Sequence, residues 1–170
     1  KTGGYLIGTC YDGNKVFQLL KDKELIEMKD EFGNVVYSIQ KKYDIEEFQY
    51  KEGDPENNMK ILGNKIDVYM NSIGQTITEY LVNFEYIIKL MKEYDFDLYS
   101  GEGGKDLFNQ SKYNYTKGIG EFEQILKDLR SIEDQSLKRF YSESFELLNK
   151  ENQELVNLSS LNNWFIFQKK

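Results

Sequence analysis

Few side chains in this sequence of 170 residues belong to the types that usually carry out chemistry. It contains no histidine and one cysteine, Cys10, which excludes Cys/His zinc sites, disulfide frameworks and His-based acid/base or triad catalysis. Glycine-rich phosphate loops and serine elbows are absent, and the glycines at 101–104 do not follow an apolar strand as a cofactor fingerprint would. Carboxylates and aromatic rings are therefore the groups left for recognition or catalysis.

Glu79 is the carboxylate with the most informative neighbours. Residues 76–79 read Thr-Ile-Thr-Glu, which is the pattern of a helix capping box with Thr76 as the N-cap. In that pattern the glutamate bonds back to the backbone of its own helix. Tyr69 lies ten residues earlier in an alternating segment, where a tyrosine of the core is the structural alternative to any binding role.

The elements that must position these side chains alternate between strands and helices. Strands are expected at 3–9, 35–39, 65–71, 96–99 and 164–167, from apolar alternation and β-branched or aromatic content. The strongest helix is expected at 77–94, because Ile77, Leu81, Phe84, Ile88 and Met91 recur every three or four residues. Shorter helices are expected near 16–20, 122–129 and 137–148, and loops at 50–58 and 100–120.

This order favours an α/β fold built as the second half of an open sheet, with an antiparallel insertion and a last strand that returns antiparallel. The length suits one domain, or most of one. Because the chain enters an apolar strand at once, we expect it to be part of a longer polypeptide.

Composition indicates a folded chain with restricted partners. Hydrophobic residues make up 39% and aromatic residues 15%, which is not the signature of disorder. The net charge of −7 excludes binding of nucleic acid by blanket phosphate neutralisation, so any RNA contact is expected to be local. No apolar run approaches the roughly 20 residues that span a bilayer, and no membrane partner or metal is expected.

Three segments carry a resemblance to one family. GGYLIGT at 3–9, followed by Asp12, resembles the fifth strand and exit loop of mRNA cap guanine-N7 methyltransferases. YMNSIG at 69–74 and EYLVNF at 79–84 are similar to that family's strand, glycine turn and helix start. LSSL at 158–161 and WFIFQK at 164–169 look like its final segment and antiparallel strand. The resemblance covers nearly the whole chain, although residues 100–157 contribute little.

The resemblance implies the C-terminal half of a Rossmann-like S-adenosylmethionine-dependent methyltransferase fold over residues 1–170, acting on the capped 5′ end of RNA. It also implies that S-adenosylmethionine binds upstream, so that this part alone is inactive. The Lys-, Asn- and Ile-rich composition is more like capping enzymes of large DNA viruses, which suggests a cytoplasmic or nuclear, not secreted, protein with other capping domains or a stimulatory subunit as partners. The alternative is a non-catalytic methyltransferase-like module that serves as a stimulatory or scaffold surface.

The same resemblance places Glu79 against the Watson-Crick edge of the cap guanine. The chemistry agrees, because guanine N1–H and N2–H₂ are adjacent donors that suit one carboxylate, whereas adenine lacks that pattern. Tyr69 matches the family's aromatic at the cap pocket, and Tyr80 is a weaker candidate. On the last strand the register puts Asn162 where the family has a tyrosine, with Trp164 as the nearest aromatic.

Overall fold

The computed structural model describes residues 1–100, 118–122 and 153–170. The chain divides into two compact units, one formed by Lys1–Cys10 with Leu90–Lys170 and the other by Tyr11–Lys89. We call them the first and the second unit and describe each by itself. The helices predicted near 122–129 and 137–148, and nearly all of the loop predicted at 100–120, lie outside the described residues.

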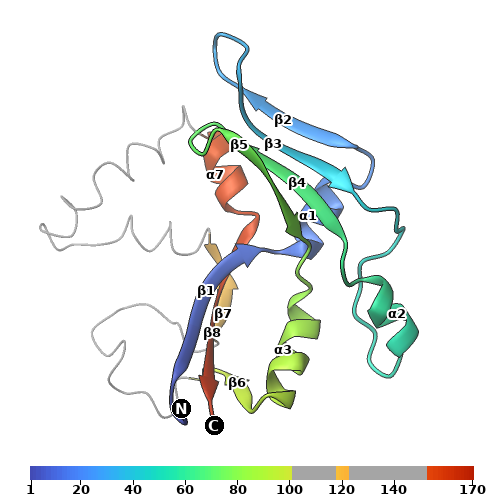
Figure 1. Cartoon of the computed structure of the whole chain (residues 1–170), viewed down its shortest axis with the longest axis vertical. Helices are drawn as coiled ribbons and strands as arrows, with labels where there is room; N and C mark the ends of the chain where they lie inside the picture. The colour runs from blue at the N-terminus through green and yellow to red at the C-terminus, as the bar shows by residue number, and fades with distance from the viewer. Residues whose placement is uncertain (101–117, 123–152) are drawn as a thin grey trace, which may run out of the picture. The chain divides into compact units, whose positions relative to one another are not determined.

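The first unit contains a small sheet with the C-terminal strand at its centre. Strand β8 (Asn162–Lys169) lies between β1 (Tyr5–Tyr11) and β6 (Phe96–Leu98), and it also pairs with β7 (Ile119–Glu121). Pairing with β6 and β7 is antiparallel, and Figure 1 shows β1 and β8 running in opposite directions. Helix α7 (Gln153–Ser159) precedes β8. The antiparallel last strand predicted from the sequence is therefore confirmed.

The core of the first unit is formed by aromatic and branched side chains. Tyr99, Trp164 and Ile166 form a buried cluster, and Phe167 is fully buried. The chain reaches this cluster through Gly118, whose φ is +62° and where an added Cβ would lie 2.6 Å from the backbone of Tyr99. Only glycine fits such a left-handed close approach without strain.

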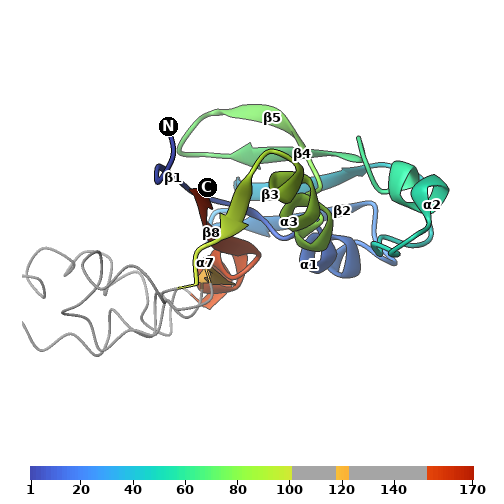
Figure 2. The same cartoon turned by 90° about the horizontal axis from the view of Figure 1, so that it is seen from below.

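The second unit is built on a four-stranded antiparallel sheet. Its strands are β2 (Leu25–Lys29), β3 (Val35–Lys42), β4 (Lys65–Met70) and β5 (Gln75–Tyr80), hydrogen-bonded in that order. Helix α1 (Gly13–Leu19) precedes the sheet and α2 (Pro55–Lys60) lies between β3 and β4. Helix α3 (Phe84–Glu93) follows β5 and leads into the first unit. Figures 1 and 2 show how these elements are arranged.

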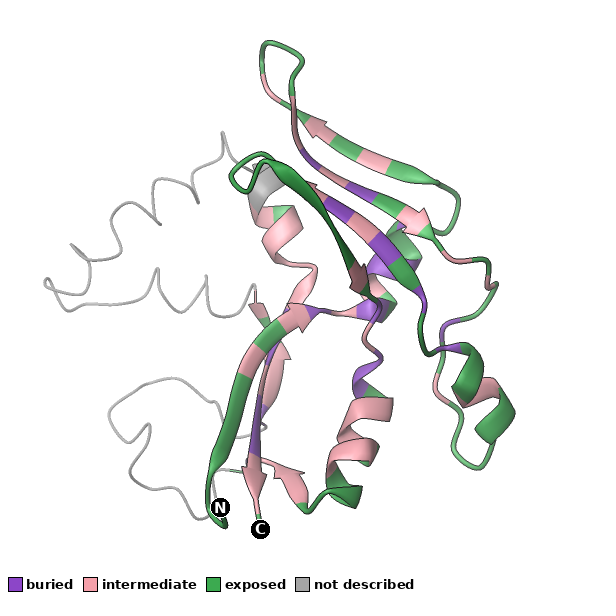
Figure 3. Ribbon diagram, viewed as in Figure 1, coloured by how far each residue is buried: buried purple, intermediate pink, exposed green. Residues whose placement is uncertain are grey.

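One face of this sheet is buried and the other is open to solvent. Side chains directly opposite one another on paired strands point to the same face. The inner face carries Tyr37, Ile39, Ile66 and Val68, which are all nearly inaccessible. The buried side chains of the unit also include Val16 and Phe17 of α1 and Leu20, the C-cap of that helix. The alternate residues form the outer face, including Asp67, Tyr69, Thr78 and Tyr80. The alternation is visible along β3 and β4 in Figure 3.

The long helix predicted at 77–94 is wrong in its first half. Residues Gln75–Tyr80 form β5, which pairs with β4 through a turn closed by Gly74, and the helix begins only at Phe84. The apparent helical period ran by chance across a strand, a turn and a helix. Thr76, Ile77 and Thr78 are β-branched, and with β4 beside them a strand is favoured.

Several smaller elements also differ from the predictions. The surface loop predicted at 50–58 contains the start of α2, in which Asp54 is the N-cap and Pro55 occupies the first helical turn. Strands β2 and β7 and helix α7 were not predicted, and β7 begins within the loop predicted at 100–120. The other predicted elements, at 3–9, 16–20, 35–39, 65–71, 96–99 and 164–167, are confirmed within a few residues, as is the mixed α/β class with its antiparallel insertion.

Candidate functional site

Glu79 lies near the end of β5 and faces inward. Its partner across the ladder is the buried Ile66, which places the carboxylate on the inner face of the sheet. The capping box predicted for Thr76 and Glu79 is therefore absent, because both residues belong to a strand. Helix α3 is instead capped by Asn83, whose Oδ1 accepts from the backbone N–H of Tyr86 at 3.0 Å.

The carboxylate of Glu79 is half-buried and unusually isolated. Burial raises its pKa above the ordinary value of 4.5, and no hydrogen bond or ion pair to it occurs within the described ranges. Carboxylates removed from water are normally paired or hydrogen-bonded, because desolvation of a charge is costly. Glu79 is therefore a half-buried acceptor without a donor in the described ranges. The buried hydroxyls of Tyr43 and Tyr50 and the Nδ2 of Asn83 also lack a hydrogen-bond partner there.

Two tyrosine hydroxyls lie near Glu79 and were not predicted as site residues. The hydroxyls of Tyr11, at the end of β1, and Tyr37, on β3, are 3.1 Å apart, and both side chains are buried. Burial raises the pKa of both phenols, and the negative charge of Glu79 adds to the increase. The pair joins residues 26 positions apart, so no local sequence signal could have revealed it.

The outer face of the same sheet carries a carboxylate in the opposite condition. Asp67 accepts a 2.6 Å hydrogen bond from Thr78 and lies 3.4 Å from the ammonium of Lys42. The bond from Thr78, followed by the contact with Lys42, holds the pKa of Asp67 below its ordinary value. This carboxylate is satisfied within the chain and has no need of a ligand.

Tyr69 and Tyr80, which the sequence suggested as neighbours of Glu79, lie on the outer face. Tyr69 is half-buried opposite Thr76, and Tyr80 is exposed beneath the ammonium of Lys65, 5.7 Å from its ring centre. Successive residues of a strand point to opposite faces, so the pleat itself separates Tyr80 from Glu79. The structure does not bring these tyrosines together with the carboxylate.

Asn162 and Trp164 belong to the first unit. Asn162 begins β8, and its Nδ2 donates to the carbonyl of Ser159 at 3.4 Å. Trp164 is a buried member of the core of that unit. Neither side chain therefore lies in the compact unit that contains Glu79.

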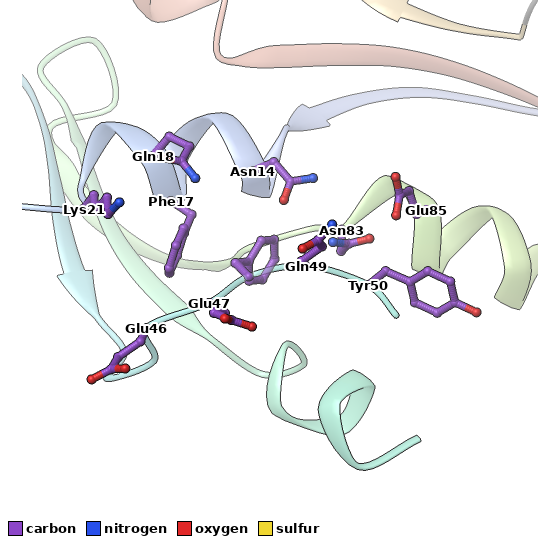
Figure 4. A pocket seen from close by; sticks show the side chains of 11 residues that line it. Asn14, Phe17, Gln18, Lys21, Glu46, Glu47, Gln49, Tyr50, Asn83 and Glu85 are labelled. Carbon is purple, nitrogen blue, oxygen red and sulfur yellow. The ribbon is translucent and has the colours of Figure 1, made fainter. Parts of the chain in front are cut away.

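A cavity of about 450 Å³ lies elsewhere in the second unit, between α1, the segment 46–50 and the start of α3 (Figure 4). Phe17 and Phe48 are stacked within its lining, with ring centres 5.7 Å apart. Gly13 permits this packing, because an added Cβ would lie 2.6 Å from the Phe48 ring. Glu79 does not line this cavity, so the carboxylate predicted from the sequence lies outside it.

The two strand-to-helix turns of the second unit are closed by side-chain caps. The N-terminus of α1 is closed by Asp12, which accepts from the backbone N–H groups of Asn14 and Lys15 at 2.9 and 3.4 Å. The N-terminus of α3 is closed by Asn83 in the same way. These caps satisfy some of the free backbone N–H groups at the start of each helix.

The described ranges contain no group of three or more potential metal-binding side chains. Among the helices described, none combines the length and apolarity needed to cross a membrane.

Comparisons with known proteins assign the chain to a family. The model of the mRNA (guanine-N(7))-methyltransferase domain matches residues 1–169. The chain is 28% identical over 120 residues to the mRNA cap guanine-N(7) methyltransferase of Candida albicans, covering 68% of this chain and 23% of that protein. It is 28% identical over 185 residues to the probable mRNA-capping enzyme of Acanthamoeba polyphaga mimivirus, covering 99% of this chain and 14% of that protein. The chain spans less than a quarter of either relative, and by its domain match it belongs to the mRNA (guanine-N(7))-methyltransferase family.

Proposed function

We propose that the protein containing this chain transfers a methyl group from S-adenosylmethionine to N7 of the guanine in an mRNA cap, and that this chain supplies the carboxylate that recognises the guanine. The observation that carries the proposal is Glu79, a half-buried carboxylate on the inner face with no donor among the described residues. Guanine provides the two missing donors on one edge, N1–H and N2–H₂.

The same carboxylate serves the reaction as well as selectivity. N7 of guanine already has a free lone pair, so methyl transfer requires positioning and no general base. The purine gains positive charge as N7 is methylated. A fixed anion in a poorly solvated site therefore stabilises the transition state more than the neutral base.

We propose further that the donor-binding part of the domain lies outside this chain. Strand β1 is at the edge of the described sheet, and Tyr5, Leu6 and Ile7 on it are 39%, 44% and 66% exposed. Consecutive exposed apolar residues are unusual on an edge strand. The open edge can form hydrogen bonds with another strand, and the exposed apolar side chains favour packing against another part of a protein. A further strand, with helices on both faces, from the donor-binding part would cover them.

The substrate of the complete protein is then the capped 5′ end of RNA. The net charge of −7 supports a contact limited to the cap and its immediate neighbours. The similarity to the mimivirus protein supports a capping enzyme of a large DNA virus, acting in the cytoplasm or nucleus beside other capping domains or a stimulatory subunit.

The test compares two carboxylates of the complete protein. Glu79→Gln keeps the size of the side chain but presents a donor to a donor edge, so we expect a roughly 100-fold loss in cap-dependent methyl transfer and in affinity for a capped dinucleotide. Asp67→Asn on the outer face is the matched control, with an expected change below about threefold. Equal activity of both variants and the wild type would refute the role of Glu79, and inactivity of the wild-type protein itself would favour the scaffold alternative.

A further inference from the structure

The Tyr11–Tyr37 pair contains one more hydroxyl proton than it uses. Two hydroxyls carry two protons, and the 3.1 Å contact between them uses one. Neither tyrosine makes a further hydrogen bond within the described part of the chain. One O–H group of the pair is therefore left without an acceptor among the described residues.

The unused proton and the unused carboxylate belong to the same neighbourhood. Asp12, next to Tyr11, pairs with Val82, which lies three residues beyond Glu79. Tyr37 and Glu79 both point to the inner face of the sheet. The negative charge of Glu79 contributes to the raised pKa of both phenols, and no hydrogen bond joins it to either of them among the described residues. Glu79 is thus an acceptor without a donor, and one hydroxyl of the Tyr11–Tyr37 pair is a donor without an acceptor. A ligand that offers donors to Glu79 and, beside them, an acceptor to the hydroxyl would satisfy both groups at once.

We propose that the Tyr11 hydroxyl donates to O6 of the guanine whose N1–H and N2–H₂ groups bind Glu79, and that Tyr37 orients Tyr11 by donating to it. This inference rests on the proposed function. On guanine O6 is adjacent to N1–H, so the edge presents acceptor, donor and donor in sequence. Adenine carries an amino group at the position of O6, and this donor would face the donor of Tyr11.

We assign the direction of the hydrogen bond between the two tyrosines from their burial, because either hydroxyl can be the donor. Tyr37 is 4% exposed and Tyr11 is 9% exposed, so Tyr11 is the member with the better access to a ligand. A hydroxyl that accepts a hydrogen bond is a stronger donor, because hydrogen bonds in a chain polarise one another. Tyr11 is accordingly a specificity-determining residue, and Tyr37 is a positioning residue that acts through it.

The proposal is tested in the complete protein with caps that contain guanine or 6-thioguanine. Sulfur is a weak acceptor in place of O6, whereas N1–H and N2–H₂ are retained. The wild type should bind the thio cap about tenfold more weakly, the effect expected for one lost hydrogen bond. Tyr11→Phe should bind the guanine cap about tenfold more weakly and show no further loss with sulfur. Tyr37→Phe should lose less affinity and keep part of the sulfur effect.

The outcomes separate this inference from the proposed function. If Glu79→Gln loses cap affinity but Tyr11→Phe retains the full sulfur effect, the role of Tyr11 is wrong and that of Glu79 stands. If Glu79→Gln binds the guanine cap normally, the proposed function fails first. Should Tyr11→Phe not fold, the comparison of the two caps on the wild-type protein still decides, because equal affinity for oxygen and sulfur overturns the proposal.

Discussion

The two faces of the antiparallel sheet in the second unit carry carboxylates in opposite conditions. Asp67 on the outer face is bonded to Thr78 and lies close to Lys42, and its pKa is lowered. Glu79 on the neighbouring strand faces inward, has no such partner in the described ranges, and its pKa is raised by burial. The two carboxylates lie on adjacent strands and differ mainly in the direction in which the pleat points them.

This difference shows how a functional carboxylate can be recognised without a ligand. A structural carboxylate obtains its donors from its own chain, and its charged form is stabilised in the folded state. A carboxylate that remains unsatisfied in a poorly solvated place costs stability, and such costs are typical of sites that await a partner. By this criterion we propose that Glu79 is the binding group and that Asp67 is structural.

The largest expected difference between the two faces is in how much a substitution lowers the free energy of unfolding. Ile39 on the inner face is fully buried, so Ile39→Ala should lower the free energy of unfolding by about 2–5 kcal/mol. Gln40, the next residue of β3, faces outward and is exposed, and Gln40→Ala should change it by less than about 0.5 kcal/mol. Native-state hydrogen exchange of the β3 and β4 amides in the complete protein measures both. Similar losses in the two variants would contradict the division into an inner and an outer face.

Sequence patterns predicted the two central strands of this sheet, β3 and β4, and missed the two outer strands, β2 and β5. The alternation at 65–71 and the β-rich run at 35–39 correctly indicated β4 and β3, because one buried face imposes a period of two. Residues 75–80 failed because the edge strand β5 buries only Glu79 in part, and the pattern of buried residues that marks a strand is therefore missing. Its apolar residues instead matched a helical period.

The candidate site was predictable only where it coincides with a local motif. Glu79 stands in the EYLV segment and could be named from the sequence, although the capping box assigned to it was wrong. Tyr11 and Tyr37 could not be named, because their contact joins residues 26 positions apart in the sequence. The family resemblance grouped Tyr69 with Glu79, but the pleat directs the two side chains to different faces.

A smaller effect concerns stability as a function of pH. The pKa of Glu79 in the folded chain lies above the ordinary value of 4.5, which applies to the unfolded chain. At a pH between these two pKa values, the folded chain therefore binds more protons than the unfolded chain. Stability should therefore fall as pH rises through this window, and Glu79→Gln should remove the fall. We expect less than about 1 kcal/mol, because the carboxylate keeps contact with water.

The contribution of Asp67 to stability depends on pH in the opposite direction, and Asp67→Asn should remove it. The native pKa of Asp67 lies below 3.8, so its contribution to stability is present above that value and is lost as pH falls through the native pKa. Hydrogen exchange of the β4 and β5 amides, corrected for intrinsic rates at each pH, measures both slopes. The same sign for the two variants would show that the carboxylates do not differ as described.

The smallest expected effect tests whether the outer face takes part in guanine recognition at all. Tyr69 is half-buried on that face, and its ring cannot stack on a base held by Glu79 if the base lies on the inner face. Tyr69→Leu should therefore change the affinity of the complete protein for a capped dinucleotide by less than about twofold. The exposed Tyr80 is a matched control on the same face, and Tyr80→Leu should behave alike. A loss of tenfold or more for Tyr69→Leu alone would restore the role predicted from the sequence, and it would mean that the base reaches the outer face, where Asp67 rather than Glu79 is the nearer carboxylate.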